Sequence, residues 1–263
     1  MSSPQEFKLS SGWLGETTPR ACIIGLGLIG GSWAGALHRL GWEVLAVDLN
    51  QDSLTKAKAK GWILEGLEAI PPTIDADLII LALPVDRMDL IVDKIISAVN
   101  PGTVVTDVAS IKNTLHFKSQ ELAARGACFI GGHPMTGSEK SGFDSARVDL
   151  FNNFPYVLIS DSECPPIALQ ALADLVRQTG AKVVMRDAVT HDLDVAYVSH
   201  LPHLIAVALT LCTEKNNGDH TTLELAGRSF REMTRVAESP PEMWQEILIR
   251  NRTAVLKALD SFL

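Results

Sequence analysis

The chain has 263 residues, which is enough for one large domain or two modest ones. Hydrophobic residues make up 46% and charged residues 21%, so the composition is that of a globular protein and excludes a disordered one. The formal net charge of -8 argues against nucleic acid or an anionic membrane as a partner. Residues 1–19 are polar and contain no long apolar run, and we expect a flexible leader with no signal peptide or membrane span.

The chain is organised around residues 20–50. A predicted buried strand over 21–24 leads into the sequence GLGLIG at 25–30, and a predicted helix over 31–40 follows. A second apolar run then ends on Asp48. The order of strand, G-x-G-x-x-G, helix, strand and acidic residue is typical of a dinucleotide-binding unit.

Each residue type in this pattern has a chemical reason. Gly25 allows a tight turn, Gly27 lets the backbone approach a pyrophosphate, and Gly30 lets the helix pack closely on the strand. Asp48 would accept hydrogen bonds from the adenosine ribose, which favours NAD over NADP. The remaining predicted cofactor contacts lie in the same loop and after two later strands: Leu26, Leu28, Ile29, Leu83, Pro84 and Val108. The alternative is a glycine-rich turn that serves packing alone.

Strand and helix patterns alternate up to Arg186. The elements expected after Asp48 are helices over 51–60, 87–99, 109–125 and 166–179, and strands over 76–83, 103–108, 127–130, 156–160 and 182–185. This alternation predicts an α/β Rossmann-type domain over residues 20–186, with a mainly parallel sheet and helices on both faces.

The pattern changes near Asp187, and residues 187–263 predict an all-α domain of three or four helices. The helices break at residues 216–219 and 239–241. Apolar runs such as 204–211 exceed what a small solvated bundle needs, so we expect this half to form a homodimer.

The candidate base is His133, which follows two glycines and precedes a proline. A histidine suits removal of a hydroxyl proton at neutral pH while hydride leaves the same carbon. The alternative is a structural histidine bonded to loop carbonyls. Ser110 would orient His133 or contact the substrate, or else cap a helix. Lys112 reads as a solvated helix residue.

Two pairs in the second half have suggestive spacing. His200 and His203 share a helix face if the helix is continuous, although Pro202 favours a helix start or kink there. With no third ligand in a matching pattern, we expect no metal site. Arg231 and Arg235 are four residues apart and either grip a carboxylate or balance nearby glutamates.

Taken together, these motifs are similar to those of the prephenate/arogenate dehydrogenase family of tyrosine biosynthesis. The resemblance runs in order from about Arg20 to the C-terminus. It is carried by GLGLIGGS at 25–32, TDVASIK at 106–112, GGHPMTGSEKSG at 131–142, LF at 150–151 with Asn153, PYVL at 155–158, HD at 191–192, SHLPH at 199–203, and Phe230-Arg231 with Thr234-Arg235.

The resemblance implies an oxidative decarboxylation, in which hydride passes from C4 of a cyclohexadienol to nicotinamide, CO2 leaves and the ring aromatises. His133 matches the catalytic base and Ser110 the serine that bonds it. Arg235 matches the arginine that grips a substrate carboxylate. The other residues matching positions around the substrate are Ser138, Glu139, Ser199, His200, His203 and Trp244.

The substrate choice stays open between prephenate, whose side chain carries a ketone, and arogenate, whose side chain carries an ammonium group. The resemblance favours prephenate with NAD, because some arogenate-type relatives lack a histidine at the position of His203 and because Asp48 fits NAD, which commonly goes with prephenate. We expect no C-terminal regulatory domain. The four cysteines are scattered and form no CxxC pair, which suits free thiols in a reducing compartment, so we expect a cytoplasmic location. A β-hydroxyacid dehydrogenase and a non-catalytic dinucleotide-sensing protein are the alternatives, but neither explains His133, Ser110 and Arg235 together.

Overall fold

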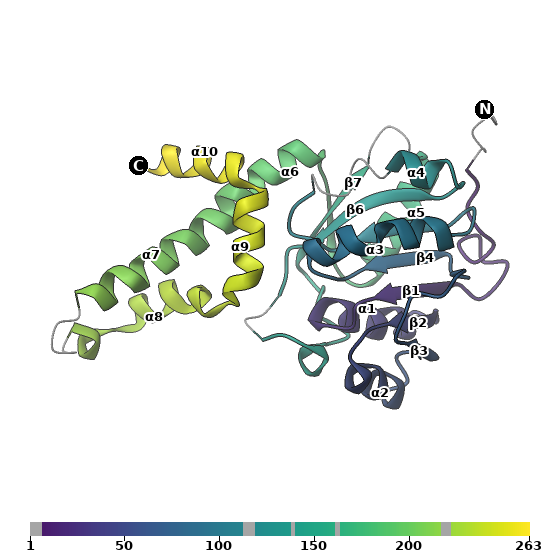
Figure 1. The fold of residues 1–263 in the computed structure, drawn as a ribbon, viewed down its shortest axis with the longest axis horizontal. Coiled ribbons are helices and arrows are strands. Elements are labelled where there is room, and N and C mark those ends of the chain that lie inside the picture. The colour runs from purple at the N-terminus through teal and green to yellow at the C-terminus, as the bar shows by residue number, and fades with distance from the viewer. Residues whose placement is uncertain (1–6, 113–118, 138–139, 161–163, 217–221) are drawn as a thin grey trace. The chain divides into compact units, whose positions relative to one another are not determined.

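The computed structural model in Figure 1 describes residues 7–112, 119–137, 140–160, 164–216 and 222–263. The chain divides into two compact units, Met1–Ala188 and Val189–Leu263. The first unit contains an eight-stranded sheet, and the described residues of the second are helices and connecting segments. The predicted fold class, a Rossmann-type α/β domain followed by an all-α domain, is therefore confirmed.

The sheet is parallel apart from one pair of neighbours. Its strands are β1 (Arg20–Ile24), β2 (Glu43–Val47), β3 (Glu65–Leu67), β4 (Leu78–Leu81), β5 (Val104–Asp107), β6 (Cys128–Pro134), β7 (Pro155–Ser160) and β8 (Lys182–Met185). They lie in the order β3-β2-β1-β4-β5-β6-β7-β8, and only β6 and β7 pair antiparallel. The carboxyl ends of β1 to β6 consequently share one edge, where α/β proteins of this type bind ligands.

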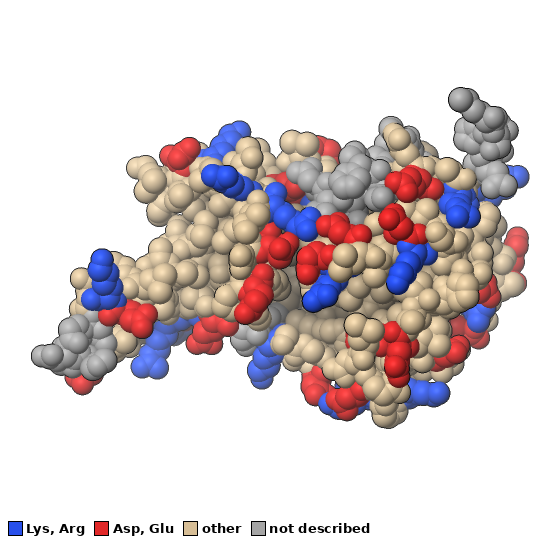
Figure 2. Space-filling view, viewed as in Figure 1, with Lys and Arg blue, Asp and Glu red and all other residues tan. Residues whose placement is uncertain are grey.

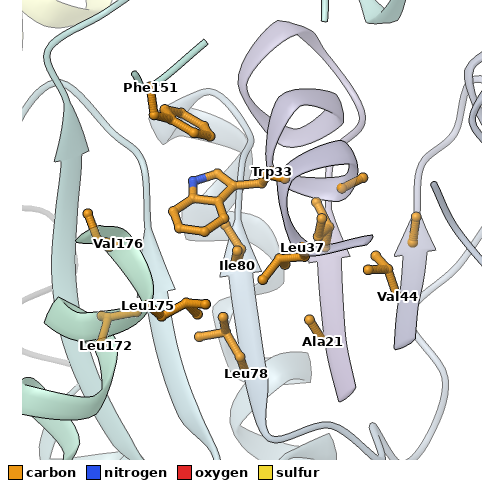
Figure 3. Close-up of a cluster of buried hydrophobic side chains, with 14 of the residues drawn as sticks. Ala21, Trp33, Leu37, Val44, Leu78, Ile80, Phe151, Leu172, Leu175 and Val176 are labelled. Atoms are coloured by element: carbon orange, nitrogen blue, oxygen red, sulfur yellow. The ribbon is translucent and has the colours of Figure 1, made fainter. Parts of the chain in front are cut away.

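Helices cover both faces because side chains alternate along each strand. The residues Ala21 and Ile23 of β1 join one core cluster, while Cys22 and Ile24 join the other. The first cluster takes its helices from α1 (Leu28–Arg39), α2 (Gln51–Ala59) and α5 (Pro166–Gln178), and the second from α3 (Val85–Ala98) and α4 (Ser119–Ala123). Figure 3 shows the first cluster, with the Trp33 indole at its centre.

The segment expected to be a flexible leader is packed against the first unit from residue 7 onward. The Trp13 indole donates a hydrogen bond to the Asp77 carbonyl at 2.9 Å and meets the Trp42 ring edge-on at 5.1 Å. Its apolar side chains lie against the core: Phe7, Leu9 and Trp13. The expectation was therefore wrong for residues 7–13, while residues 1–6 lie outside the described part.

Two further expectations were wrong near the predicted base. The segment Gly131 to Pro134 was expected as a loop, but it belongs to β6 and pairs with β7. Residues 109–112 were expected to open a helix and instead form an irregular segment, so Ser110 caps no helix there. The expected continuation over 113–118 lies outside the described residues.

The second unit begins with one long helix that widens in its middle. It runs through α6 (Ala188–Val195), a π-helical stretch η3 (Ala196–His200) and α7 (Leu201–Lys215). Pro202 lacks an amide hydrogen, so the chain there cannot form one regular α-helical bond. The π-helical stretch directly before it keeps the helix continuous where the sequence favoured a start or kink.

The rest of the second unit consists of short helices. These are η4 (Thr222–Leu225), α8 (Arg228–Thr234), η5 (Arg235–Glu238), α9 (Pro241–Arg250) and α10 (Arg252–Phe262). Breaks after Lys215 and before Pro241 agree with the predicted ones.

Candidate active site

The glycine-rich loop between β1 and α1 has the local geometry that its pattern predicts. Gly25 has a φ of 99°, which favours glycine, and its N–H donates to the Val47 carbonyl at 2.8 Å. A Cβ on Gly30 would lie 1.9 Å from the Gly25 carbonyl oxygen, so the helix approaches the loop as closely as a glycine allows. A Cβ on Gly27, by contrast, would meet nothing within 4 Å.

Gly27 is also the N-cap of α1, and no side chain caps that helix end. The N–H groups of the first turn therefore offer hydrogen bonds to a phosphate, aided by the helix dipole. Open space at Gly27 beside these donors fits a pyrophosphate, and the loop fits a dinucleotide better than the packing-only alternative.

Asp48 follows β2 directly and is partly exposed. One of its carboxylate oxygens accepts the Leu26 N–H at 2.5 Å and the other accepts the Asn50 N–H at 2.7 Å. The carboxylate therefore both anchors the glycine-rich loop and leaves negative charge beside it. A ribose with free hydroxyls suits that charge better than a ribose 2′-phosphate does.

The remaining predicted cofactor contacts lie at the same sheet edge. Leu83 and Pro84 follow β4, and a Cβ on Gly25 would approach the Leu83 side chain within 2.8 Å. Val108 follows β5 and donates its N–H to the Leu81 carbonyl at 3.2 Å. The predicted residues of the first unit thus gather along the carboxyl ends of β1, β2, β4 and β5.

His133 lies near the carboxyl end of β6, on the strand next to β5, and is buried. Its backbone pairs with Val157 of β7. Ser110 lies three residues after the end of β5. The predicted base lies in β6 and its predicted partner in the segment that follows the neighbouring strand β5, so both lie at the sheet edge that carries the glycine-rich loop.

A buried ion pair near these two residues was not foreseen from the sequence. Lys112, expected to be solvated, is buried and forms an ion pair with Asp107 at the end of β5. Both side chains are 3% exposed. Both residues stand in the motif TDVASIK, five positions apart, but the burial of Lys112 depends on contacts with β6 that the motif does not reveal.

In the second unit, two predicted substrate residues, His200 and His203, lie against a third, Trp244. The His203 ring stacks on Trp244 with centroids 3.6 Å apart, and His200 meets Trp244 edge-on at 6.0 Å. Three polar atoms of this cluster are buried and have no hydrogen-bond partner among the described residues: His200 Nε2, His203 Nδ1 and Trp244 Nε1. Buried polar atoms usually have partners, so these atoms are free to bond a molecule bound beside them.

Asn251, which the sequence did not single out, orients His200. Its side-chain amide donates to the Asp192 carbonyl at 2.7 Å and lies 3.2 Å from His200 Nδ1. An amide nitrogen donates only, so Nδ1 accepts and the neutral ring carries its proton on Nε2. His200 and Trp244 would therefore each present an N–H to a carboxylate or ketone oxygen.

Burial favours the neutral form of both histidines. It lowers the pKa of His200 from 6.5 to about 4, although the nearby Asp192 carboxylate acts in the opposite direction. Burial also lowers the pKa of His203, against a backbone hydrogen bond with Val236 that raises it. His191, next to Asp192, places its Nδ1 2.8 Å from that carboxylate.

Arg235 begins η5 and is exposed, and the contact between Val236 and His203 places this turn beside α7. Arg231 lies in α8, and the change to a 3-10 turn at Arg235 interrupts the regular helical spacing between them. Ser199 lies in the π-helical stretch and is partly exposed. Ser138 and Glu139 lie outside the described residues.

No group of three or more potential metal ligands occurs within the described ranges. On the face in Figure 2, acidic and basic side chains are interspersed.

Two family models match the chain. The nucleotide-binding domain of prephenate dehydrogenase matches residues 33–185, and the dimerization domain of prephenate dehydrogenase matches residues 187–263. A prephenate dehydrogenase of Lactococcus lactis subsp. cremoris is 34% identical over 245 residues, which is 91% of this chain and 67% of that protein. The chain thus spans about two thirds of the length of this curated relative.

Solved structures agree with this match. A prephenate dehydrogenase from A. aeolicus, in complex with hydroxyphenyl propionate and NAD+, has a TM-score of 0.85 and 30% identity, covering 94% of this chain and 87% of that one. A Synechocystis arogenate dehydrogenase has a TM-score of 0.79 and 32% identity, covering 92% and 87%. The resemblance seen in the sequence is confirmed, and the chain belongs to the prephenate dehydrogenase family of oxidoreductases.

Proposed function

We propose that this protein oxidises and decarboxylates prephenate to 4-hydroxyphenylpyruvate with NAD. The observation that carries the proposal is the position of His133, near the carboxyl end of β6 and on the sheet edge that bears the glycine-rich loop. The family match and the relatives named prephenate dehydrogenase support it. The alternative substrate is arogenate, which would yield tyrosine, and the Synechocystis structure keeps that alternative open.

The catalytic roles follow from side-chain chemistry. NAD, when bound, supplies the acceptor for the hydride that leaves C4 of the substrate. His133 takes the proton of the C4 hydroxyl, and Ser110 bonds the histidine and the hydroxyl. As the new carbonyl forms, the bond from the ring to the carboxylate breaks, CO2 leaves and the ring becomes aromatic.

The second unit supplies the substrate-binding groups in this proposal. Arg235 grips a carboxylate, and the N–H groups of His200 and Trp244 bond the side chain of prephenate. Neutral His200 presents Nε2–H to an oxygen atom, which suits a ketone or carboxylate and not an ammonium. Ser138, Glu139, Ser199 and His203 complete the proposed set.

For the cofactor we propose NAD over NADP, because Asp48 places a carboxylate beside the loop that would hold the adenosine half. The NAD+ in the A. aeolicus structure supports this choice.

We also propose a homodimer through the helical domain and a cytoplasmic location. The helix from Ala188 to Lys215 has a mean hydropathy of 1.6 over its most apolar window, of which 33% is buried. Its length and composition would also suit a membrane span, but it lies in the part that matches a dimerization domain, which supports our proposal that a second copy covers it.

The test of the reaction is initial-rate formation of NADH or NADPH with prephenate or arogenate against NAD or NADP. We expect prephenate with NAD to dominate. His133→Asn should abolish turnover and leave NAD binding nearly intact, while His38→Asn, which changes an exposed histidine of α1, serves as the matched control. NAD binding with no turnover of either substrate by the wild type would refute the proposal and favour a dinucleotide sensor.

A further inference from the structure

The buried ion pair between Asp107 and Lys112 holds the backbone that leads into His133. Asp107 Oδ1 accepts the Gly132 N–H at 2.9 Å, and Lys112 Nζ donates to the Gly132 carbonyl at 2.5 Å. Lys112 Nζ also lies 2.5 Å from Asp107 Oδ2. Both polar groups of one glycine, the residue before the base, are thus bonded by a single ion pair.

These side chains act where the backbone ladder stops. The last residues that pair between β5 and β6 are Thr106 and Ile130, so on the side facing β5 the ladder does not reach Gly132, which pairs only with Leu158 of β7. Asp107 Oδ2 also accepts the Ala109 N–H at 3.1 Å, which fixes the start of the segment that carries Ser110. One carboxylate therefore ties the segment before Ser110 to the residue before His133.

The two glycines before His133 make this approach possible. A Cβ on Gly132 would lie 2.6 Å from the Asp107 carbonyl oxygen and 3.0 Å from Thr106 Oγ1. A Cβ on Gly131 would lie 3.3 Å from the Lys112 side chain. The pair of glycines is therefore explained by close packing around the ion pair.

Stability alone is a weak reason for such a pair. Removing two charges from water largely offsets their attraction, and uncharged replacements of similar size are often neutral or stabilising. The pair's bonds instead fix the backbone beside the base and its partner.

We propose that Asp107 and Lys112 are positioning residues, which hold His133 and Ser110 in register for proton abstraction. This inference rests on the proposed function for its kinetic consequences. A displacement of about 1 Å at a reacting group can cost on the order of 100-fold in rate. Loss of the pair should therefore lower kcat while the NAD site, built around the β1–α1 loop, stays intact.

The test compares Lys112→Met with the double variant Asp107→Asn/Lys112→Met. The single variant leaves an unpaired buried carboxylate and should lose both stability and kcat. The double variant removes both charges and should recover much of the stability. We expect its kcat to stay roughly 10- to 100-fold below the wild-type value. The KM for NAD should remain within about 2-fold of the wild-type value, because neither substitution alters the β1–α1 loop.

The matched control is Asp77→Asn. Asp77 is also buried and accepts the Arg20 N–H at 2.7 Å, but it lies before β4, at the opposite end of that strand from the site. This variant should melt lower and keep the wild-type kcat. A double variant that keeps the wild-type kcat would overturn the proposal, whether or not it loses stability as Asp77→Asn does.

A second readout does not depend on turnover. In protein with labelled histidine, the His133 ring should give one sharp set of NMR signals, assigned by their loss in His133→Asn. The double variant should shift or broaden them. If the wild type turns over neither substrate, the proposed function fails, and unchanged His133 signals in the folded double variant would separately refute positioning.

Discussion

Gly27 and Gly30 lie three residues apart, yet the structure predicts opposite consequences for replacing each with alanine. A Cβ on Gly30 would lie 1.9 Å from the Gly25 carbonyl oxygen, whereas real Cβ contacts stay above 3.0 Å. The backbone of α1 or of the loop must therefore move. Overpacking of this kind costs about 1–3 kcal/mol, and in a chain of this size each kcal/mol lowers Tm by roughly 2–4 °C.

Gly27→Ala leaves the fold nearly unchanged. The new Cβ meets nothing within 4 Å, and the φ of -77° is open to alanine. Alanine is a poorer N-cap than glycine, which limits the loss to about 1 kcal/mol or less. The methyl group would instead fill the space that the pyrophosphate needs, and we expect NAD to bind about 10- to 100-fold more weakly, equivalent to about 1.4–2.8 kcal/mol.

Thermal unfolding and NAD titration of the two variants separate these effects. Gly30→Ala should lose both Tm and NAD affinity, and Gly27→Ala should lose affinity alone. If Gly27→Ala bound NAD as the wild type does, or melted as low as Gly30→Ala, the assignment of the space at Gly27 to the cofactor would be refuted.

Three other predictions concern single side chains. Asp48→Ser should shift the ratio of kcat/KM for NAD over NADP toward NADP by about 10-fold or more. Asp48→Asn is the control, because it removes the charge but keeps a side-chain oxygen that can accept a backbone N–H of the loop. If the NAD to NADP ratio of kcat/KM stayed unchanged in both variants, Asp48 would not face the ribose. His200 has a folded pKa of about 4 against 6.5, so the unfolded chain binds the proton more readily and stability falls as pH drops from 6.5 to 4. This loss of unfolding free energy amounts to up to about 3 kcal/mol. Urea unfolding at several pH values should show a smaller loss in His200→Gln than in the wild type, and the same pH dependence in both would contradict the burial argument. Trp33→Ala should cost about 3–5 kcal/mol of unfolding free energy, because the indole is fully buried with Phe151 at 5.0 Å and Tyr156 at 5.8 Å. Trp13→Ala, at a partly exposed indole, should cost less, and equal losses would refute the ranking.

The sequence by itself determined the dinucleotide loop, the alternation of strands and helices, and the helical second half. These features depend on local properties. The φ of Gly25, the close approach at Gly30 and the acid after β2 are encoded within about 30 residues, and the hydrophobic period distinguishes strand from helix. His133 and Ser110 were predicted from short motifs and from their resemblance to a known family, and their catalytic roles stay predictions.

Only the tertiary structure decided the features that depend on partners distant in sequence. Lys112 reads as a solvated lysine until β6 places the Gly132 carbonyl beside it, 20 residues along the chain. Periodicity is the same in parallel and antiparallel strands, so the reversal at β7 and the place of His133 within β6 were hidden. His200 is oriented by Asn251, and Trp13 is held by Asp77, through contacts 51 and 64 residues apart. A local pattern specifies the backbone of each element, but packing between elements determines which side chains are buried, charged or left without a partner.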